Sequence, residues 1–153
     1  MSEIHGMAGH QIRRLNQISQ AIFRERMAAA GIDLTPVQYA VLATLAGQPD
    51  LDQAGLAAEI AYDKVTIGGV IDRMVAKGLV DRRPSPTDRR AKALRLTKDG
   101  HAMFEQVRPD VRALQDTILA GLDREERDCF LDLLARLTNT PTRDETRRPA
   151  PAD

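Results

Sequence analysis

Residues 61–97 read AYDKVTIGGVIDRMVAKGLVDRRPSPTDRRAKALRLT, and this stretch decides the fold. Its first half predicts an amphipathic helix, because apolar residues recur from Ile67 onward at the i, i+3, i+4, i+7 and i+8 positions that share one helix face. Asp63 is a suitable N-cap, and the Lys77-Gly78 pair is a suitable end. We therefore expect one helix with a single buried face.

The second half of the same stretch predicts a β-hairpin. Residues 79–83 and 92–96 have the composition of strands, and the turn between them contains Pro84, Pro86 and Asp88. Alternating Leu and Arg in the second strand place apolar side chains on one face. A helix that leads into a two-stranded basic hairpin is the outline of a winged helix-turn-helix.

Charge is concentrated in this part of the chain. Nine Lys or Arg and four Asp lie between Asp63 and Arg95, so the segment carries +5 while the whole chain is neutral. A localised positive field favours the binding of a polyanion such as double-stranded DNA along one face. Simple solvation of a basic hairpin is the alternative explanation.

Three motifs extend the pattern beyond the hairpin. They are LTPVQYAVL at 34–42, D-x-x-T at 63–66, and GLVDRRPSPTDRRAKALRLTKDG at 78–100. Together they resemble the MarR family of bacterial winged-helix transcription regulators, over about residues 10–137. The resemblance implies a mainly α fold with a small β-hairpin wing, in which a winged helix-turn-helix is joined to long terminal dimerisation helices.

The remaining sequence supplies the other expected elements. Thr35, Pro36 and Gln38 predict a capping box at the start of a second helix, and Asp52 is the expected cap of a third. Near the C-terminus, Thr97 and Asp123 are expected caps, and the long helix between them should kink or break at its proline, Pro109. The expected organisation is a flexible N-terminus at 1–6, dimerisation helices at 7–33 and 98–137, a DNA-binding lobe at 34–97 and a disordered tail at 138–153.

The terminal helices carry apolar stripes that a small winged helix cannot cover. Exposed, these stripes would form a larger patch than monomers usually tolerate. A two-fold homodimer would bury them and place two recognition helices about 34 Å apart, which is one turn of B-DNA. The resemblance implies the same dimer.

The face of the recognition helix opposite its buried stripe is the expected DNA-reading surface. Lys64 and Thr66, near the helix N-terminus, would reach base edges, and Arg73 would hold a phosphate. Gly68 and Gly69 together lower helix stability by roughly 2 kcal/mol relative to alanine. Such a pair is expected where the backbone approaches DNA closely, although a kink or tight packing against the preceding helix would also explain it.

On the wing, the resemblance implies a D-x-R tip at Asp88 and Arg90, in which the aspartate braces the hairpin and the arginine enters the minor groove. A turn-capping aspartate with solvated arginines is the alternative. Asp72 would repel the DNA backbone, so we expect it to orient Arg73 or Arg89. The further cations expected at phosphates are Arg82, Arg89 and Lys92.

Regulation is also implied by the resemblance, since many members of the family bind small aromatic acids between the dimer helices and the DNA-binding lobe. Tyr39 matches a position that often lines that cleft, and His10, Arg13 and Arg14 would supply donors for an anion. A structural tyrosine with solvated arginines is the alternative, and His10 is equally placed to contact the other subunit.

Composition excludes several classes. The chain has 153 residues, one cysteine and no apolar run long enough for a membrane helix, so we expect a soluble cytoplasmic protein without intramolecular disulfides, while a disulfide between subunits stays open. Motifs of nucleotide-binding, hydrolytic and metal-dependent enzymes are absent from the sequence, and no cofactor or metal is expected. Cys129 sits beside Phe130 on the last helix and is expected to be buried.

The sequence thus predicts a homodimeric repressor that binds a pseudo-palindromic operator. Its expected effector is a small aromatic carboxylate, for example a benzoate-, hydroxycinnamate- or nicotinate-like catabolite. Two alternatives remain open: a redox-responsive regulator acting through Cys129, and a winged-helix protein-interaction module that does not bind DNA.

Overall fold

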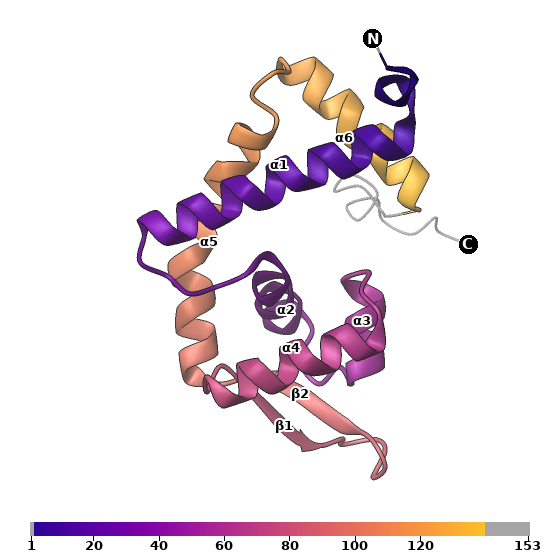
Figure 1. Cartoon of the computed structure of the whole chain (residues 1–153). Helices are drawn as coiled ribbons and strands as arrows, with labels where there is room; N and C mark the ends of the chain where they lie inside the picture. The colour runs from indigo at the N-terminus through magenta and orange to yellow at the C-terminus, as the bar shows by residue number, and fades with distance from the viewer. Residues whose placement is uncertain (1, 140–153) are drawn as a thin grey trace, which may run out of the picture. The chain divides into compact units, whose positions relative to one another are not determined.

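The computed structural model describes residues 2–139 and confirms the predicted fold class, mainly helical with a two-stranded antiparallel hairpin (Figure 1). One compact unit comprises residues 1–115, and a second begins at Asp116. In chain order the elements are η1 (Glu3–Gly6), α1 (Ala8–Ala29), α2 (Pro36–Gly47), α3 (Gln53–Glu59), α4 (Lys64–Ala76), β1 (Val80–Pro84), β2 (Lys92–Leu96), α5 (Lys98–Ile118) and α6 (Arg124–Thr138).

The helix starts follow from local capping chemistry. Thr35 and Gln38 form the predicted capping box, in which each side chain accepts a hydrogen bond from the other residue's backbone N–H at 3.2 Å. The Asp52 carboxylate accepts from the Gly55 N–H at 2.7 Å, and the Asp63 carboxylate accepts from the Thr66 N–H at 2.8 Å.

The core of the lobe lies where α2, α3, α4 and β2 meet, and it contains no aromatic side chain. The buried face predicted for α4 is confirmed, because Ile67, Val70, Ile71 and Met74 are each at most 2% exposed. They pack with other fully buried aliphatic residues of the lobe, namely Val41, Leu42, Leu45, Leu56 and Leu94. This packing fixes the orientation of the recognition helix, α4.

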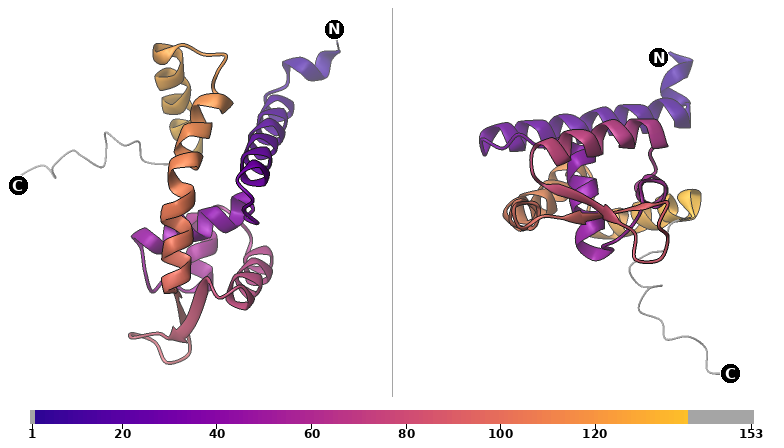
Figure 2. Two further views of the ribbon diagram at one scale, coloured as in Figure 1. Left: turned by 90° about the vertical axis from the view of Figure 1, so that its left-hand side faces the viewer. Right: turned by 90° about the horizontal axis from the view of Figure 1, so that it is seen from below.

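The hairpin projects beyond the helices of the lobe as a wing (Figure 2). Its strands pair antiparallel from Val80↔Leu96 to Pro84↔Lys92. At its base, the backbone of Asp50 and Leu51 is hydrogen-bonded to Leu94, at 3.1 and 2.9 Å. The guanidinium of Arg95, whose second nitrogen donates to the Asp50 carboxylate at 2.6 Å, adds a bidentate ion pair.

Helix α5 starts at the predicted cap, since the Thr97 hydroxyl accepts a hydrogen bond from the Gly100 N–H at 3.0 Å. The helix runs without interruption through Pro109, so the alternative of a break there is wrong. Val107, Val111 and Leu114 are buried on both sides of the proline, and this packing holds the helix together where one backbone hydrogen bond is lost.

Helix α6 begins with the capping box predicted at Asp123 and Glu126, with both hydrogen bonds at 2.9 Å. None of its residues is buried. The expectation that Cys129 is buried is therefore wrong for the single chain, because Cys129 is exposed. A sequence pattern marks the apolar stripe of α6 but does not show whether another part of the same chain covers it.

Both predicted ends lie at the limits of the described chain. Glu3–Gly6, within the segment expected to be flexible, form one turn of 3-10 helix. Thr138, the first residue of the predicted tail, is the last residue of α6, and residues 140–153 lie outside the described part. No helix within residues 2–139 is both long and apolar enough to cross a membrane.

Candidate nucleic-acid interface

The N-terminus of α4 is organised by Asp63. Its carboxylate accepts hydrogen bonds from both the backbone N–H and, at 2.6 Å, the hydroxyl of Thr66, and these bonds hold the pKa of Asp63 below its usual range. The Thr66 hydroxyl hydrogen is therefore already engaged. Lys64 is exposed beside it and free to donate.

The two glycines of α4 have different surroundings. A Cβ on Gly68 would lie 2.9 Å from the Gln53 side-chain nitrogen, which itself donates to the Lys64 carbonyl at 3.0 Å. A methyl group at Gly68 would therefore displace the end of the Gln53 side chain and its hydrogen bond to α4. A Cβ on Gly69 would meet nothing closer than an Arg73 guanidinium nitrogen at 3.9 Å, so packing within the chain does not require glycine there.

Val65 is the most exposed of the large apolar side chains in the described chain, at 87%. On a helix, its neighbours at i+3 and i+4 are Gly68 and Gly69, which have no side chains to cover it. The first two turns of α4 therefore present an ammonium group, one bare isopropyl group and a smooth backbone surface.

At the wing tip, Asp88 braces the turn. Its side chain accepts a hydrogen bond from the Arg90 backbone N–H at 2.9 Å, and its carbonyl accepts from the Ala91 N–H at 3.2 Å. These bonds fit both the bracing that the family resemblance implies for Asp88 and the alternative of a turn-capping aspartate. The guanidinium groups of Arg89 and Arg90 have no partner within residues 2–139.

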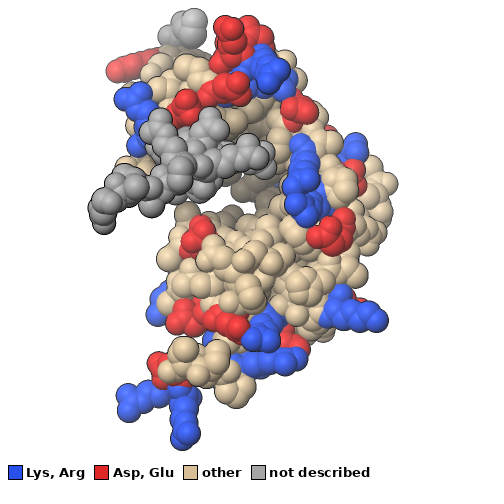
Figure 3. Space-filling view, turned by 180° about the vertical axis from the view of Figure 1, so that it is seen from behind, with Lys and Arg blue, Asp and Glu red and all other residues tan. Residues whose placement is uncertain are grey.

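The cations of the lobe fall into two groups. Arg82 is paired with Asp72, so the expectation that Asp72 orients Arg73 or Arg89 is wrong: the wing strand lies close enough to α4 to supply a different partner. Within the lobe, at residues 34–97, the cations without an ion pair are the predicted contacts Lys64, Arg73, Arg89, Arg90 and Lys92. Lys and Arg side chains gather at the wing end of the lobe (Figure 3).

A hollow of about 350 Å³ separates the wing from α3 and α4. Basic residues of both elements line it, with Lys64 from α4, and Arg82 and Lys92 from the hairpin. Gln53 of α3 adds an amide to the rim. Asp52 also lines the hollow, and Arg82 is already paired with Asp72, so Lys64 and Lys92 are its cations without an ion pair.

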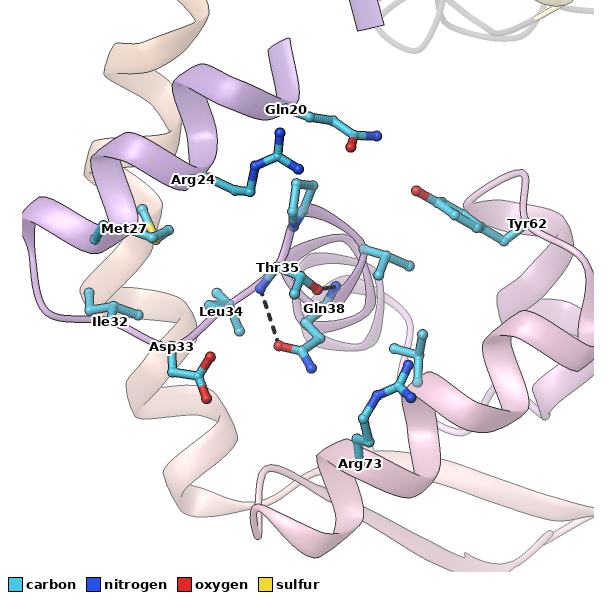
Figure 4. A pocket seen from close by; sticks show the side chains of 14 residues that line it. Gln20, Arg24, Met27, Ile32, Asp33, Leu34, Thr35, Gln38, Tyr62 and Arg73 are labelled. Atoms are coloured by element: carbon cyan, nitrogen blue, oxygen red, sulfur yellow. Dashed lines mark hydrogen bonds between the residues drawn. The ribbon is translucent and has the colours of Figure 1, made fainter. Parts of the chain in front are cut away.

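A larger cleft, of about 490 Å³, lies between α1, the start of α2 and α4 (Figure 4). Its apolar lining comes from Met27, Ile32, Leu34 and Val70, among others, and its polar lining includes Arg24, Gln38, Tyr62 and Arg73. Gln38 is only 4% exposed. The sequence predicts that Gln38 is a capping residue. No local sequence pattern indicates that Gln38 or Arg24 lines this cleft.

The residues predicted to bind an effector lie outside that cleft. The Tyr39 ring packs between Phe23 and Phe104, with ring centroids 6.3 and 5.9 Å away, and burial raises the pKa of its hydroxyl. His10 and Arg13 contact each other at 3.3 Å on α1, and Arg14 is exposed. The structure does not gather these four residues around one cavity, and their role stays a prediction.

Known proteins resemble this chain along almost its whole length. The sequence model of the MarR family matches residues 32–91. The transcriptional repressor NicR of Pseudomonas putida is 30% identical, over 90% of this chain and 86% of its own. Among solved structures, BpsR of Bordetella bronchiseptica, whose DNA binding is regulated by 6-hydroxynicotinic acid, is 30% identical with a TM-score of 0.81, over 88% and 95% of the two chains.

A third relative has been solved on DNA. The transcriptional repressor CouR, bound to a 23-mer duplex, is 28% identical with a TM-score of 0.79 and covers 90% of this chain and 96% of its own. The similarity therefore spans most of this chain and most of each relative. The chain belongs to the MarR family of transcription regulators.

Proposed function

We propose that this chain is a homodimeric repressor that acts in the cytoplasm and leaves its operator when a small aromatic carboxylate binds. The observation that carries the DNA-binding part is the division of charge on the lobe. Its structural cations are paired with aspartates, whereas Lys64, Arg73, Arg89, Arg90 and Lys92 are exposed and have no ion pair within residues 2–139. Unpaired cations on a recognition helix and a wing are what phosphate contacts require.

The dimer is supported by exposed apolar side chains at both ends of the described chain. Ile12 and Ile18 on α1 are 58% and 47% exposed, and Leu137 on α6 is 78% exposed. Other large apolar residues exposed there are Ile4, Met7, Leu131 and Leu133. Pairing through these helices would remove them from water and would present two recognition helices to one pseudo-palindromic operator.

The proposed effector class has two supports. The relative BpsR is regulated by an aromatic carboxylic acid. The lobe of this chain also adjoins a cleft with apolar walls and cationic edges. We carry His10, Arg13, Arg14 and Tyr39 forward as the effector residues that the family resemblance implies.

The test is to pass a pool of random duplexes over the purified full chain and to sequence the DNA that it retains. The affinity for a retained duplex should fall steeply with salt, with a slope that reports the number of neutralised phosphates. If no sequence is enriched and the slope is flat, the lobe is a protein-interaction module and the proposal fails. Addition of benzoate or 6-hydroxynicotinate should release the retained duplex.

A further inference from the structure

The first turn of α4 contains a hydroxyl group whose hydrogen-bonding direction is fixed. The Thr66 hydroxyl lies 2.6 Å from Oδ2 of Asp63, and the Thr66 backbone nitrogen lies 2.8 Å from Oδ1 of the same carboxylate. The bond from the hydroxyl, followed by that from the backbone N–H, holds the pKa of Asp63 below its usual range. An ionised carboxylate only accepts hydrogen bonds, so the single hydrogen of the Thr66 hydroxyl belongs to this pair.

The oxygen of that hydroxyl still has lone pairs to offer. No group within residues 2–139 donates to it, and Thr66 is exposed. Its neighbour at i+3 on the helix is Gly69, which carries no side chain to cover it. Thr66 therefore presents an accessible acceptor and no donor on the face of α4 that is expected to read DNA.

The major groove contains two kinds of group that such an acceptor can tell apart. Adenine and cytosine present an exocyclic amine there, whereas thymine and guanine present a carbonyl oxygen. A threonine hydroxyl that turns freely pairs with either kind. A hydroxyl that can only accept pairs with an amine and leaves a carbonyl oxygen without a donor.

We propose that Asp63 makes Thr66 a one-way acceptor, and that Thr66 thereby selects adenine or cytosine at one position of each operator half-site. The inference rests on the proposed function and specifies what the recognition helix reads. The Thr66 oxygen accepts from the adenine N6 or cytosine N4 amine while its hydrogen stays with Asp63. Asp63 is a positioning residue that does not itself touch the duplex.

The sharpest test reverses the direction of the bond. In Asp63→Asn, the amide oxygen keeps the bond from the Thr66 backbone N–H, and asparagine is as good an N-cap as aspartate. The NH₂ group of the new amide then donates to the Thr66 oxygen, which frees the hydroxyl hydrogen to point at the duplex. This variant should prefer guanine or thymine at the position where the unmodified protein prefers adenine or cytosine.

Three further variants separate reading from capping. Thr66→Val removes the hydroxyl at nearly constant shape, and Thr66→Ser restores it. The matched control is Asp52→Asn, which removes the same charge from the cap of α3. Within residues 2–139 the Asp52 carboxylate accepts from the Gly55 N–H, at 2.7 Å, and from no hydroxyl. Each full-length variant selects from the same pool of random duplexes, sequencing gives the base frequencies at each operator position, and melting temperatures show that each variant is folded.

We expect the unmodified protein to prefer adenine or cytosine about threefold or more at this position of each half-site, the net value of one hydrogen bond. The preference should disappear in Thr66→Val and reverse in Asp63→Asn. It should persist in Thr66→Ser and in Asp52→Asn. The reversal changes which base is selected, a result that a loss of helix stability alone would not produce.

Two results would overturn the inference without touching the proposed function. If Thr66→Val retains every base preference of the unmodified protein, the hydroxyl only reinforces the helix cap. If Asp63→Asn still selects adenine or cytosine, Asp63 does not set the direction of the bond. Failure of the unmodified protein to enrich any sequence is a different outcome, because the proposed function then fails as well.

Discussion

The two adjacent glycines of α4 call for different explanations, one within the chain and one outside it. A methyl group at Gly68 would displace the end of the Gln53 side chain, so this contact favours glycine without any ligand. Gly69 has no such neighbour in the chain, although it lowers helix stability. We propose that glycine is favoured there by an approaching duplex, because the exposed face of a recognition helix approaches DNA.

Replacing Gly69 by alanine should therefore stabilise the free protein and weaken its complex with operator DNA. Higher helix propensity raises the free energy of unfolding by about 0.5–1 kcal/mol, which corresponds to roughly 1–4 °C in Tm. Gly68→Ala, whose new methyl group presses on Gln53, should not gain this stability. An operator affinity that is unchanged in Gly69→Ala would show that the backbone does not approach the duplex there.

Arg90 is exposed and unpaired within residues 2–139, so its loss should leave the Tm unchanged. We expect Arg90→Ala to weaken operator binding about tenfold or more, as for other specific base contacts. The control is Arg83→Ala, an exposed wing arginine that is paired with Asp81 at 3.5 Å and is not a predicted contact. If the two variants lowered operator affinity equally, Arg90 would be a general phosphate contact and not a specific contact in the groove.

Val65 tests direct readout by the recognition helix. Its bare isopropyl group has a natural counterpart in the thymine methyl, the apolar group of the major groove. Replacing one critical thymine of each half-site by uracil should weaken binding about fifteenfold, because two buried methyl groups are lost and each is worth about fourfold. The uracil effect should disappear in Val65→Ala and persist in Lys64→Ala. A uracil effect that survives in Val65→Ala would assign the methyl contact to another residue.

Among the elements, the wing depends on an anchor at its base. Asp50 adopts a left-handed conformation, with φ of 72°, and joins the end of α2 to β2 through its backbone and its ion pair with Arg95. The hydrogen bond from Arg95 holds the pKa of the Asp50 carboxyl below its usual range.

This shift predicts how stability depends on pH. A carboxyl whose pKa is lower in the folded state stabilises the fold above its unfolded pKa, and the contribution is lost as the pH falls through the folded value. Asp50→Asn, which tolerates the same backbone conformation, should thus be less stable than the unmodified protein at neutral pH. The difference in denaturant midpoint should shrink below about pH 4. A difference that stays constant down to acid pH would mean that the ion pair is not its source.

The elements also show what a sequence can predict. Caps such as Thr35, Asp63 and Asp123 were predictable because an N-cap and its N3 partner are three residues apart. The pairing of Asp72 with Arg82 and the exposure of Cys129 were not, because each depends on where distant segments lie. A local rule about proline allowed a break of the helix at Pro109. The helix is continuous there because buried residues pack on both sides of the proline. The residues that line the cleft beside α2 come from helices far apart in sequence.

At the scale of the whole molecule, the exposed apolar residues fall into two sets. One set, near the two ends of the described chain, is what a dimer would cover. The other, Tyr62 and Val65, flanks the start of α4 and lies outside the expected dimer helices.

Sedimentation equilibrium should report a dimer, and Leu137→Arg should shift it to monomer because a charge would be buried in the interface. Val65→Arg, at a residue of similar exposure, should remain dimeric, and a monomer in the unmodified protein would exclude the proposed assembly.

Hydroxyl-radical footprinting of a retained operator tests the central claim most directly. A dimer that presents α4 and its wing twice should protect two half-sites whose centres are about 10 base pairs apart, related by a two-fold axis. Protection of minor-groove sugars should flank each half-site, and this flanking protection should disappear in Arg90→Ala. A single protected tract without two-fold symmetry would contradict the account.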